Sequence, residues 1–172
     1  MCGIAGYIGN YTPDVARAMM KAQAHRGPDG HGSFIDLDAA VALTHCRLSI
    51  IDLSNGGHQP MTDASGNFTI VFNGEIYNYR ALRDELVGRG VVFKGSSDTE
   101  VILALYALDG PAIFRRLNGI FALAIWDARD HSLTLARDGL GVKPLYLHES
   151  VRGIAFASEL KALLALPDLD KT

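Results

Sequence analysis

The chain has 172 residues, a formal net charge of −3 and two cysteines. This length favours one domain with a sizeable core, and the charge excludes the strongly basic surface typical of nucleic-acid-binding proteins. Two cysteines do not make a disulfide framework, no apolar run reaches the ~18 residues of a membrane span, and the first residues do not resemble a secretory signal; we therefore expect a cytoplasmic protein with no membrane partner.

Hydrophobic periodicity predicts helices and short β-rich strands along the whole chain. Thr12 is a candidate N-cap for the first helix, Gly90 a candidate stop for the second, and Ser97 with Glu100 a candidate capping box for the third. In chain order, the predicted elements are strand Ile4–Ile8, helix Val15–Ala24, strands Val41–Ile50 and Phe68–Phe72, helices Tyr79–Arg89 and Asp98–Leu108, a short helical piece after Pro111, and strands Ile120–Trp126, Leu133–Ala136, Leu145–Leu147 and Ile154–Ala157.

The arrangement of these elements favours an α+β fold. Strands outnumber helices, and several helices fall together in the middle of the chain, which does not fit a βαβ repeat. Asp127–His131 has the composition of a hairpin turn, and Ile120–Trp126 is apolar on both faces, so that strand should lie between two layers. We expect mainly antiparallel sheet covered by helices.

Cys2 directly follows the initiator Met1. If Met1 is removed, one residue carries both a thiol and a free α-amine, whose ordinary pKa near ~8 lets it accept the thiol proton. A nucleophile with its own base would result. The alternative is a buried thiol at the start of the first strand.

Four polar clusters interrupt apolar segments: His25-Arg26-Gly27-Pro28-Asp29-Gly30, Arg47-Leu48-Ser49-Ile50-Ile51-Asp52, Asn73-Gly74-Glu75-Ile76-Tyr77-Asn78 and Ser97-Asp98-Thr99-Glu100. With Cys2-Gly3-Ile4 before them and Ala157-Ser158-Glu159-Leu160-Lys161 after them, they resemble the glutamine amidotransferase domain of the asparagine synthetase family, the class with an N-terminal cysteine. The resemblance runs over nearly the whole chain in the family's order. Arg26-Gly27-Pro28-Asp29-Gly30 and Asn73-Gly74-Glu75-Ile76-Tyr77-Asn78 favour this branch over the relatives that make phosphoribosylamine or glucosamine phosphate.

The resemblance implies a fold and a reaction. The fold is the four-layer αββα sandwich of the N-terminal-nucleophile hydrolases, in which helices cover two mainly antiparallel sheets, and residues 1–172 would form one glutaminase domain. The reaction is hydrolysis of the side-chain amide of L-glutamine to glutamate and ammonia through a Cys2 thioester. Asn73 and Gly74 would form the oxyanion hole, although Asn73-Gly74 by itself would indicate a hairpin turn after Phe68–Phe72.

Further residues would hold the amino-acid head of glutamine. Arg47 would pair with the α-carboxylate, because a guanidinium suits a planar bidentate partner. Asp98, with help from Glu75, would accept from the α-ammonium, although an Asp at a helix start is often only a cap. The backbone of the segment containing Leu48, Ile50 and Ile51 should line the site. Arg26 is expected to be structural.

No metal site and no cofactor are expected in this domain. His25, His31, His45 and Cys46 are near in sequence, but their spacing matches no metal-binding pair. The resemblance places ATP and magnesium in a synthetase domain, whose pyrophosphate loop this sequence lacks. The expected partners are therefore L-glutamine and a synthetase domain or subunit, and a homodimer is compatible with the resemblance.

Two other functions remain open from the residues. The first is a non-catalytic regulatory or binding domain on the same fold, and the second is an N-terminal-nucleophile amidase for another amide. Arg47 and Asp98 together would recognise a free α-amino acid, which argues for glutamine. Each catalytic reading requires that Met1 is removed.

Overall fold

The computed structural model describes residues 1–48 and 57–170. In chain order the elements are β1 Gly3–Gly9, α1 Pro13–Ala22, η1 Ala24–Arg26, β2 Gly30–Asp36, β3 Val41–Arg47, β4 Met61–Thr62, β5 Phe68–Ile76, α2 Tyr79–Gly88, α3 Asp98–Asp109, η3 Gly110–Arg115, β6 Gly119–Asp127, β7 Ser132–Arg137, β8 Tyr146–Ser150, β9 Gly153–Ala157 and α4 Leu160–Leu163, where η denotes 3₁₀-helix.

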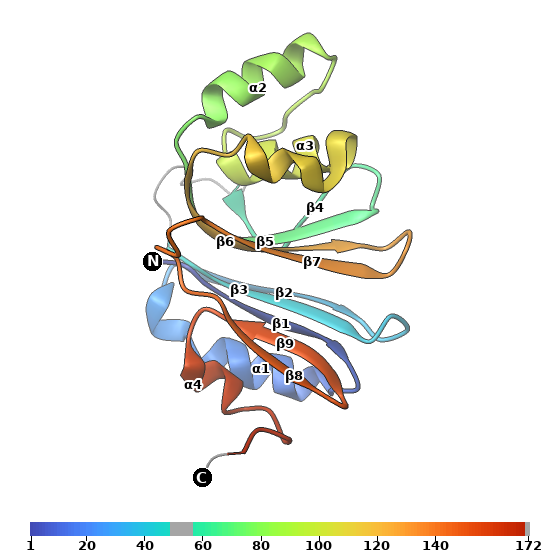
Figure 1. Ribbon diagram of the computed structural model, residues 1–172, viewed down its shortest axis with the longest axis vertical. Helices are drawn as coiled ribbons and strands as arrows, with labels where there is room; N and C mark the ends of the chain where they lie inside the picture. Colours follow the sequence, from blue (N-terminus) through green and yellow to red (C-terminus); the bar gives the residue numbers. More distant parts are fainter. Residues whose placement is uncertain (49–56, 171–172) are drawn as a thin grey trace.

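Two antiparallel sheets lie face to face. Within the described residues, one sheet has the strand order β2-β3-β1-β9-β8 and the other has the order β4-β5-β6-β7. Helices α1 and α4 cover the outside of the first sheet, and α3 covers the outside of the second, with α2 packed against α3 (Figure 1). The expected four-layer αββα sandwich is confirmed.

Three hydrophobic cores hold the four layers together, and strand alternation assigns each side chain to one of them. Along β6, Ala122, Ala124 and Trp126 face the gap between the sheets, where they pack with Ile4 and Phe156 of the other sheet. The intervening residues of β6 face α2 and α3. A separate core lies beneath α1 and α4. The prediction that the strand Ile120–Trp126, which is part of β6, lies between two layers is confirmed.

The predicted helix signals are largely confirmed. The Ser97 hydroxyl accepts a hydrogen bond from the backbone N–H of Glu100, so Ser97 caps α3. Helix α2 ends in a Schellman motif, in which Gly90 has φ +88° and the Val91 N–H donates to the carbonyl of Leu86. Thr12 stands at the N-cap of α1 without a side-chain cap bond.

The strand predictions differ from the structure most at β2, β5 and β3. Strand β2 is glycine-rich and polar, and was not predicted; pairing with β3 along its full length holds it extended. Strand β5 continues through Asn73-Gly74 to Ile76, so the hairpin-turn interpretation of that dipeptide is wrong. Strand β3 ends at Arg47, and the rest of the predicted Val41–Ile50 strand lies partly outside the described residues.

The described residues contain no helix long and apolar enough to cross a membrane.

Candidate active site

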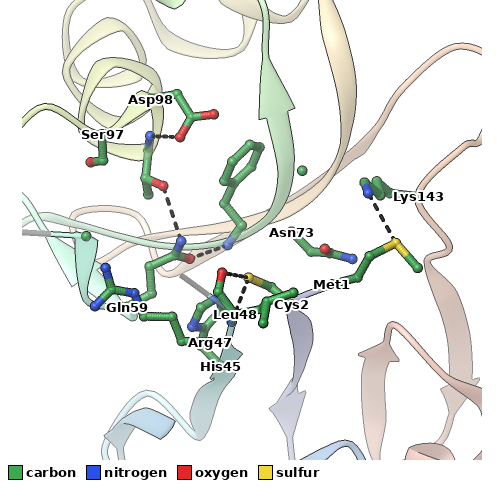
Figure 2. A pocket seen from close by; sticks show the side chains of 14 residues that line it. Met1, Cys2, His45, Arg47, Leu48, Gln59, Asn73, Ser97, Asp98 and Lys143 are labelled. Carbon is green, nitrogen blue, oxygen red and sulfur yellow. Dashed lines mark hydrogen bonds between the residues drawn. The ribbon is translucent and has the colours of Figure 1, made fainter. Parts of the chain in front are cut away.

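A small open pocket, with a free volume of about 80 Å³, lies at one end of the gap between the sheets. Polar residues of the pocket lie on or next to strands of both sheets: Cys2 precedes β1, Arg47 ends β3, and Asn73 lies in β5. Successive side chains of a strand point to opposite faces, so these three can face the pocket while their neighbours face away. The loop before α3 completes the opposite wall (Figure 2). Of the predicted site residues, the structure brings six to this pocket: Cys2, Arg47, Leu48, Asn73, Gly74 and Asp98.

The Cys2 thiol is half-buried and is held by one neighbouring residue. Its Sγ accepts from the Leu48 backbone N–H at 3.4 Å and donates to the Leu48 carbonyl at 3.5 Å. The predicted backbone lining at Leu48 therefore meets the thiol itself. Met1 precedes Cys2 and also lines the pocket, and its Sδ accepts from Lys143 Nζ at 3.3 Å (Figure 2).

Asn73 presents a buried polar group to the pocket. The residue is 1% exposed, and its Nδ2 has no hydrogen-bond partner among the described residues. Leaving a buried donor unpaired typically costs about 1–3 kcal/mol. Such a donor is expected where a ligand oxygen is to be bound.

Gly74 follows Asn73 in β5, opposite Phe121 of β6. A Cβ atom at this position would lie 2.2 Å from the carbonyl oxygen of Ile120. The neighbouring strand therefore requires glycine here, and this reason is separate from the predicted role of Gly74 in an oxyanion hole.

Asp98 lies at the start of α3 and is 5% exposed. One carboxylate oxygen accepts from the Ile76 backbone N–H at 3.0 Å, and the other accepts from the Thr99 N–H at 3.0 Å. Burial raises the pKa of Asp98, the two backbone hydrogen bonds oppose that rise, and the nearby Glu75 charge adds to it. Asp98 thus ties α3 to β5 while lining the pocket, and Ser97 supplies the cap.

Three predicted site residues are not placed in the pocket. Glu75 is exposed and does not line it, so its contact with a substrate ammonium stays a prediction. Ile50 and Ile51 lie outside the described residues.

Several pocket residues were not identified from the sequence. Gln59 is buried, accepts from the Phe72 N–H at 2.6 Å and donates to the Thr99 hydroxyl at 3.2 Å, so it joins β5 to α3 beneath the pocket. His45 lines the pocket from β3, and burial lowers its pKa to about 3, which makes the imidazole neutral at neutral pH. Lys143, which follows β7 in the loop before β8, also lines the pocket.

A family model described as "Glutamine amidotransferase domain" matches residues 1–172. The asparagine synthetase [glutamine-hydrolyzing] 1 of Bacillus subtilis is 42% identical over 171 residues, which are 95% of this chain and 27% of that protein. A putative asparagine synthetase [glutamine-hydrolyzing] of Mycobacterium tuberculosis is 42% identical over 98% of this chain and 28% of its own length. The chain thus spans about a quarter of the length of these curated relatives.

Among solved structures, the glutamine phosphoribosylpyrophosphate amidotransferase of Bacillus subtilis superimposes with a TM-score of 0.79 at 19% identity. The match covers 96% of this chain and 43% of that one, and at this identity it shows the fold alone. The fold is the N-terminal-nucleophile hydrolase sandwich, as the resemblance implied. The chain belongs to the glutamine amidotransferase domain family, with asparagine synthetases among its similar relatives.

Proposed function

We propose that this domain hydrolyses the side-chain amide of L-glutamine to glutamate and ammonia, with Cys2 as the nucleophile. The observation that carries the proposal is that the Cys2 thiol and the unpartnered Nδ2 of Asn73 share one pocket. A nucleophile and a preorganised donor in the same pocket are the two groups that acyl transfer needs.

The reaction follows from these groups. The α-amine of Cys2 accepts the thiol proton as Sγ bonds to the amide carbon, and the amide oxygen becomes an oxyanion held by Asn73 Nδ2 and the Gly74 backbone N–H. The intermediate collapses as the C–N bond breaks, and the ammonium of Cys2 returns the proton to the departing ammonia. Water then attacks the thioester and the amine accepts one of its protons. Breaking of the C–S bond releases glutamate, and the ammonium returns that proton to Sγ, which restores the thiol and the free amine.

Arg47 and Asp98 would hold the amino-acid head of glutamine. Both line the pocket. Arg47 ends strand β3 of the first sheet, and Asp98 begins α3, the helix that covers the second sheet. A guanidinium pairs with the α-carboxylate and a carboxylate accepts from the α-ammonium, so the two together select a free α-amino acid. Glu75, through its charge near Asp98, would add to the attraction for the ammonium.

Removal of Met1 is a condition of this mechanism. With Met1 in place, the nitrogen of Cys2 is an amide and cannot accept a proton. Met1 also lines the pocket, so its removal would free both the base and part of the space for substrate.

We further propose that the ammonia serves an asparagine-synthetase-type amidation. The support is that the similar relatives are glutamine-hydrolyzing asparagine synthetases, although this chain matches only about a quarter of their length. ATP and magnesium would then belong to the synthetase domain or subunit, with no cofactor in residues 1–172. A reducing cytoplasm would keep Cys2 as a thiol, and a homodimer stays a prediction.

The test is ammonia release from glutamine by processed protein, with the N-terminus determined by intact mass. We expect hydrolysis by the wild-type chain and none by Cys2→Ala. Hydrolysis that saturates with glutamine but not with α-acylated glutamine supports recognition of a free amino-acid head. Saturation by α-acylated amides would instead favour an amidase for another amide, and no thiol-dependent hydrolysis at all would favour a non-catalytic domain.

A further inference from the structure

Arg26 contacts the nucleophilic residue directly. Its side chain is 9% exposed, and its Nε donates to the backbone carbonyl of Cys2 at 2.9 Å. The carbonyl, the α-amine and the thiol-bearing Cβ all radiate from the Cα atom of Cys2. A fixed carbonyl therefore limits where the two reacting groups can point, and Arg26 has more than the structural role that the sequence suggested.

This contact matters most once Met1 is absent. Cys2 would then be the first residue, with no preceding peptide to hold it, and terminal residues are poorly ordered unless they are tied down. Within the described residues, the ties on Cys2 are the Leu48 contacts to its thiol and the Arg26 contact to its carbonyl. The first of these involves the atom that must react.

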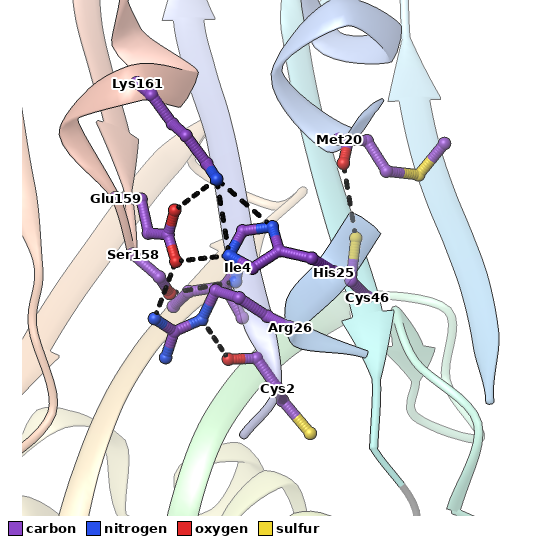
Figure 3. Close-up of polar contacts among 9 residues, drawn as sticks. All are labelled: Cys2, Ile4, Met20, His25, Arg26, Cys46, Ser158, Glu159 and Lys161. Atoms are coloured by element: carbon purple, nitrogen blue, oxygen red, sulfur yellow. Dashed lines mark hydrogen bonds and ion pairs between the residues drawn. The ribbon is translucent and has the colours of Figure 1, made fainter. Parts of the chain in front are cut away.

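Glu159 in turn holds Arg26. Its Oε1 accepts from Arg26 Nη1 at 3.0 Å and lies 3.0 Å from His25 Nε2, while its Oε2 lies 3.1 Å from Lys161 Nζ (Figure 3). Burial alone would raise the pKa of Glu159, but the hydrogen bonds from Arg26, Lys161 and His25 outweigh it and hold that pKa below its ordinary value. Glu159 is therefore an anion at neutral pH, and it compensates the charge of the nearly buried guanidinium.

The backbone around Glu159 is fixed to the strand that carries Cys2. The preceding residue, Ser158, donates its N–H to the Ile4 carbonyl at 2.8 Å and accepts from the Ile4 N–H through its hydroxyl at 3.0 Å. Glu159 thus stands at a defined distance from the start of β1. Figure 3 shows Glu159, Arg26 and Cys2 in line, from three segments far apart in the sequence.

We propose that Glu159 is a positioning residue for Cys2, acting through Arg26. The proposal rests on the proposed glutaminase function. Without the carboxylate, Arg26 would keep its charge but lose the partner that aims its Nε at the Cys2 carbonyl. Misplacement of reacting groups by about 1 Å can lower a rate by about 10²-fold, so we expect a loss in turnover and not in substrate binding.

The first test is Glu159→Gln, compared with Glu85→Gln as a matched control. Glu85 also forms an ion pair with an arginine, Arg116, but on α2. For Glu159→Gln we expect kcat for glutamine to fall about 10- to 100-fold with KM within about threefold. The control should stay within about twofold of wild type in both constants. Wild-type kcat in Glu159→Gln would overturn the proposal, as would an equal loss in the control.

A double-mutant cycle separates positioning from a general structural role. If Glu159 acts through Arg26, adding Glu159→Gln to Arg26→Met should lower kcat by less than about twofold beyond Arg26→Met alone, because residues in one network are not additive. Losses that multiply would show independent roles and would overturn the proposal. If Glu159→Gln does not fold, Glu159→Asp keeps the charge but is one methylene shorter, and wild-type kcat in that variant would overturn it equally.

A spectroscopic readout keeps the two proposals apart. The amide nitrogen of Gly3 belongs to the same peptide group as the Cys2 carbonyl, so its ¹⁵N chemical shift reports the Arg26 hydrogen bond. We expect that shift to move in Glu159→Gln and Arg26→Met and to stay in Glu85→Gln. If wild-type protein releases no ammonia, the proposed function fails, but the Gly3 shifts of the variants still test whether Glu159 acts on Cys2 through Arg26. If the enzyme is active and the Gly3 shift does not move in Glu159→Gln, that positioning role is overturned while the proposed function stands.

Discussion

The two cysteines lie close together on opposite faces of the same sheet. Cys46 of β3 pairs with Gly3 of β1, directly after Cys2. Cys2 faces the pocket and is half-buried, whereas Cys46 is fully buried and its Sγ donates to the Met20 carbonyl of α1 at 3.4 Å. Burial, with a smaller contribution from Cys2, raises the pKa of Cys46 to about 11, so this thiol is protonated and inert at neutral pH.

This contrast shows that the face of the sheet decides what a thiol can do. The residue types and the strand environment are similar, and the alternation of side chains sends one thiol to a polar pocket and the other to a helix-covered core. Arg47, the neighbour of Cys46, faces the pocket for the same reason. Charge next to Cys46 in the sequence therefore does not activate it.

The largest expected difference is between Cys2→Ala and Cys46→Ala. Cys2→Ala should abolish glutamine hydrolysis and leave the melting temperature near wild type. Cys46→Ala should keep wild-type kcat and lower the free energy of unfolding by about 1 kcal/mol, because it removes a buried sulfur. Ammonia release and thermal melting of both variants check this, and loss of activity in Cys46→Ala would contradict the assignment of the two faces.

The next effect concerns the unpaired amide of Asn73. Asn73→Ala should lower kcat by about 10²- to 10³-fold, the usual loss for one oxyanion-hole donor. Because Nδ2 has no partner in the described residues, its removal should not lower the free energy of unfolding. Steady-state kinetics and denaturant unfolding measure the two quantities; a large loss of stability would show that the amide serves the fold.

A smaller effect is expected at Asp98. Asp98→Asn should raise KM for glutamine by about 10- to 100-fold, since hydrogen bonds to charged groups contribute about 1.5–3 kcal/mol. The pKa of Asp98 is raised in the folded protein, so its contribution to stability is present at acid pH and is lost as pH rises through the folded pKa. Asp98→Asn leaves one acceptor oxygen for the backbone N–H groups of Ile76 and Thr99, so its melting temperature should fall below that of wild type, and by more in acid than at neutral pH.

The smallest expected effect is the acid dependence of the Glu159 cluster. The pKa of Glu159 is lowered, so its contribution to stability is present above the ordinary value of 4.5 and is lost as pH falls through the folded pKa. The difference in melting temperature between wild type and Glu159→Gln should therefore be largest at neutral pH and disappear in acid. A difference that persists unchanged at pH 3 would contradict the ion pairs around Glu159.

The elements with strong local signals could be predicted from the sequence. Helix α3 has a serine cap and a regular apolar pattern, and β6 is apolar on both faces. Strand β2 could not be predicted, because its glycines and polar residues have low strand propensity and only pairing with β3 makes it a strand. The Asn73-Gly74 turn signal failed for a similar reason: pairing with Ala122 and Phe121 overrides it.

The candidate site shows the same division. The predicted residues that reach the pocket belong to motifs that are contiguous in the sequence. Gln59 and His45 reach it through tertiary packing, which a single sequence does not encode in a readable pattern. The pairing of Arg26 with Glu159, separated by 133 positions, also depends on how β9 returns beside β1.

The central claim is that Cys2 becomes the catalyst once it is the first residue. The most direct measurement is glutaminase activity of two preparations, one processed and one retaining Met1, with each N-terminus determined by intact mass. We predict thiol-dependent ammonia release from the processed chain and none from the chain that retains Met1. Equal activity in both preparations would contradict the mechanism in which the α-amine of Cys2 acts as the base.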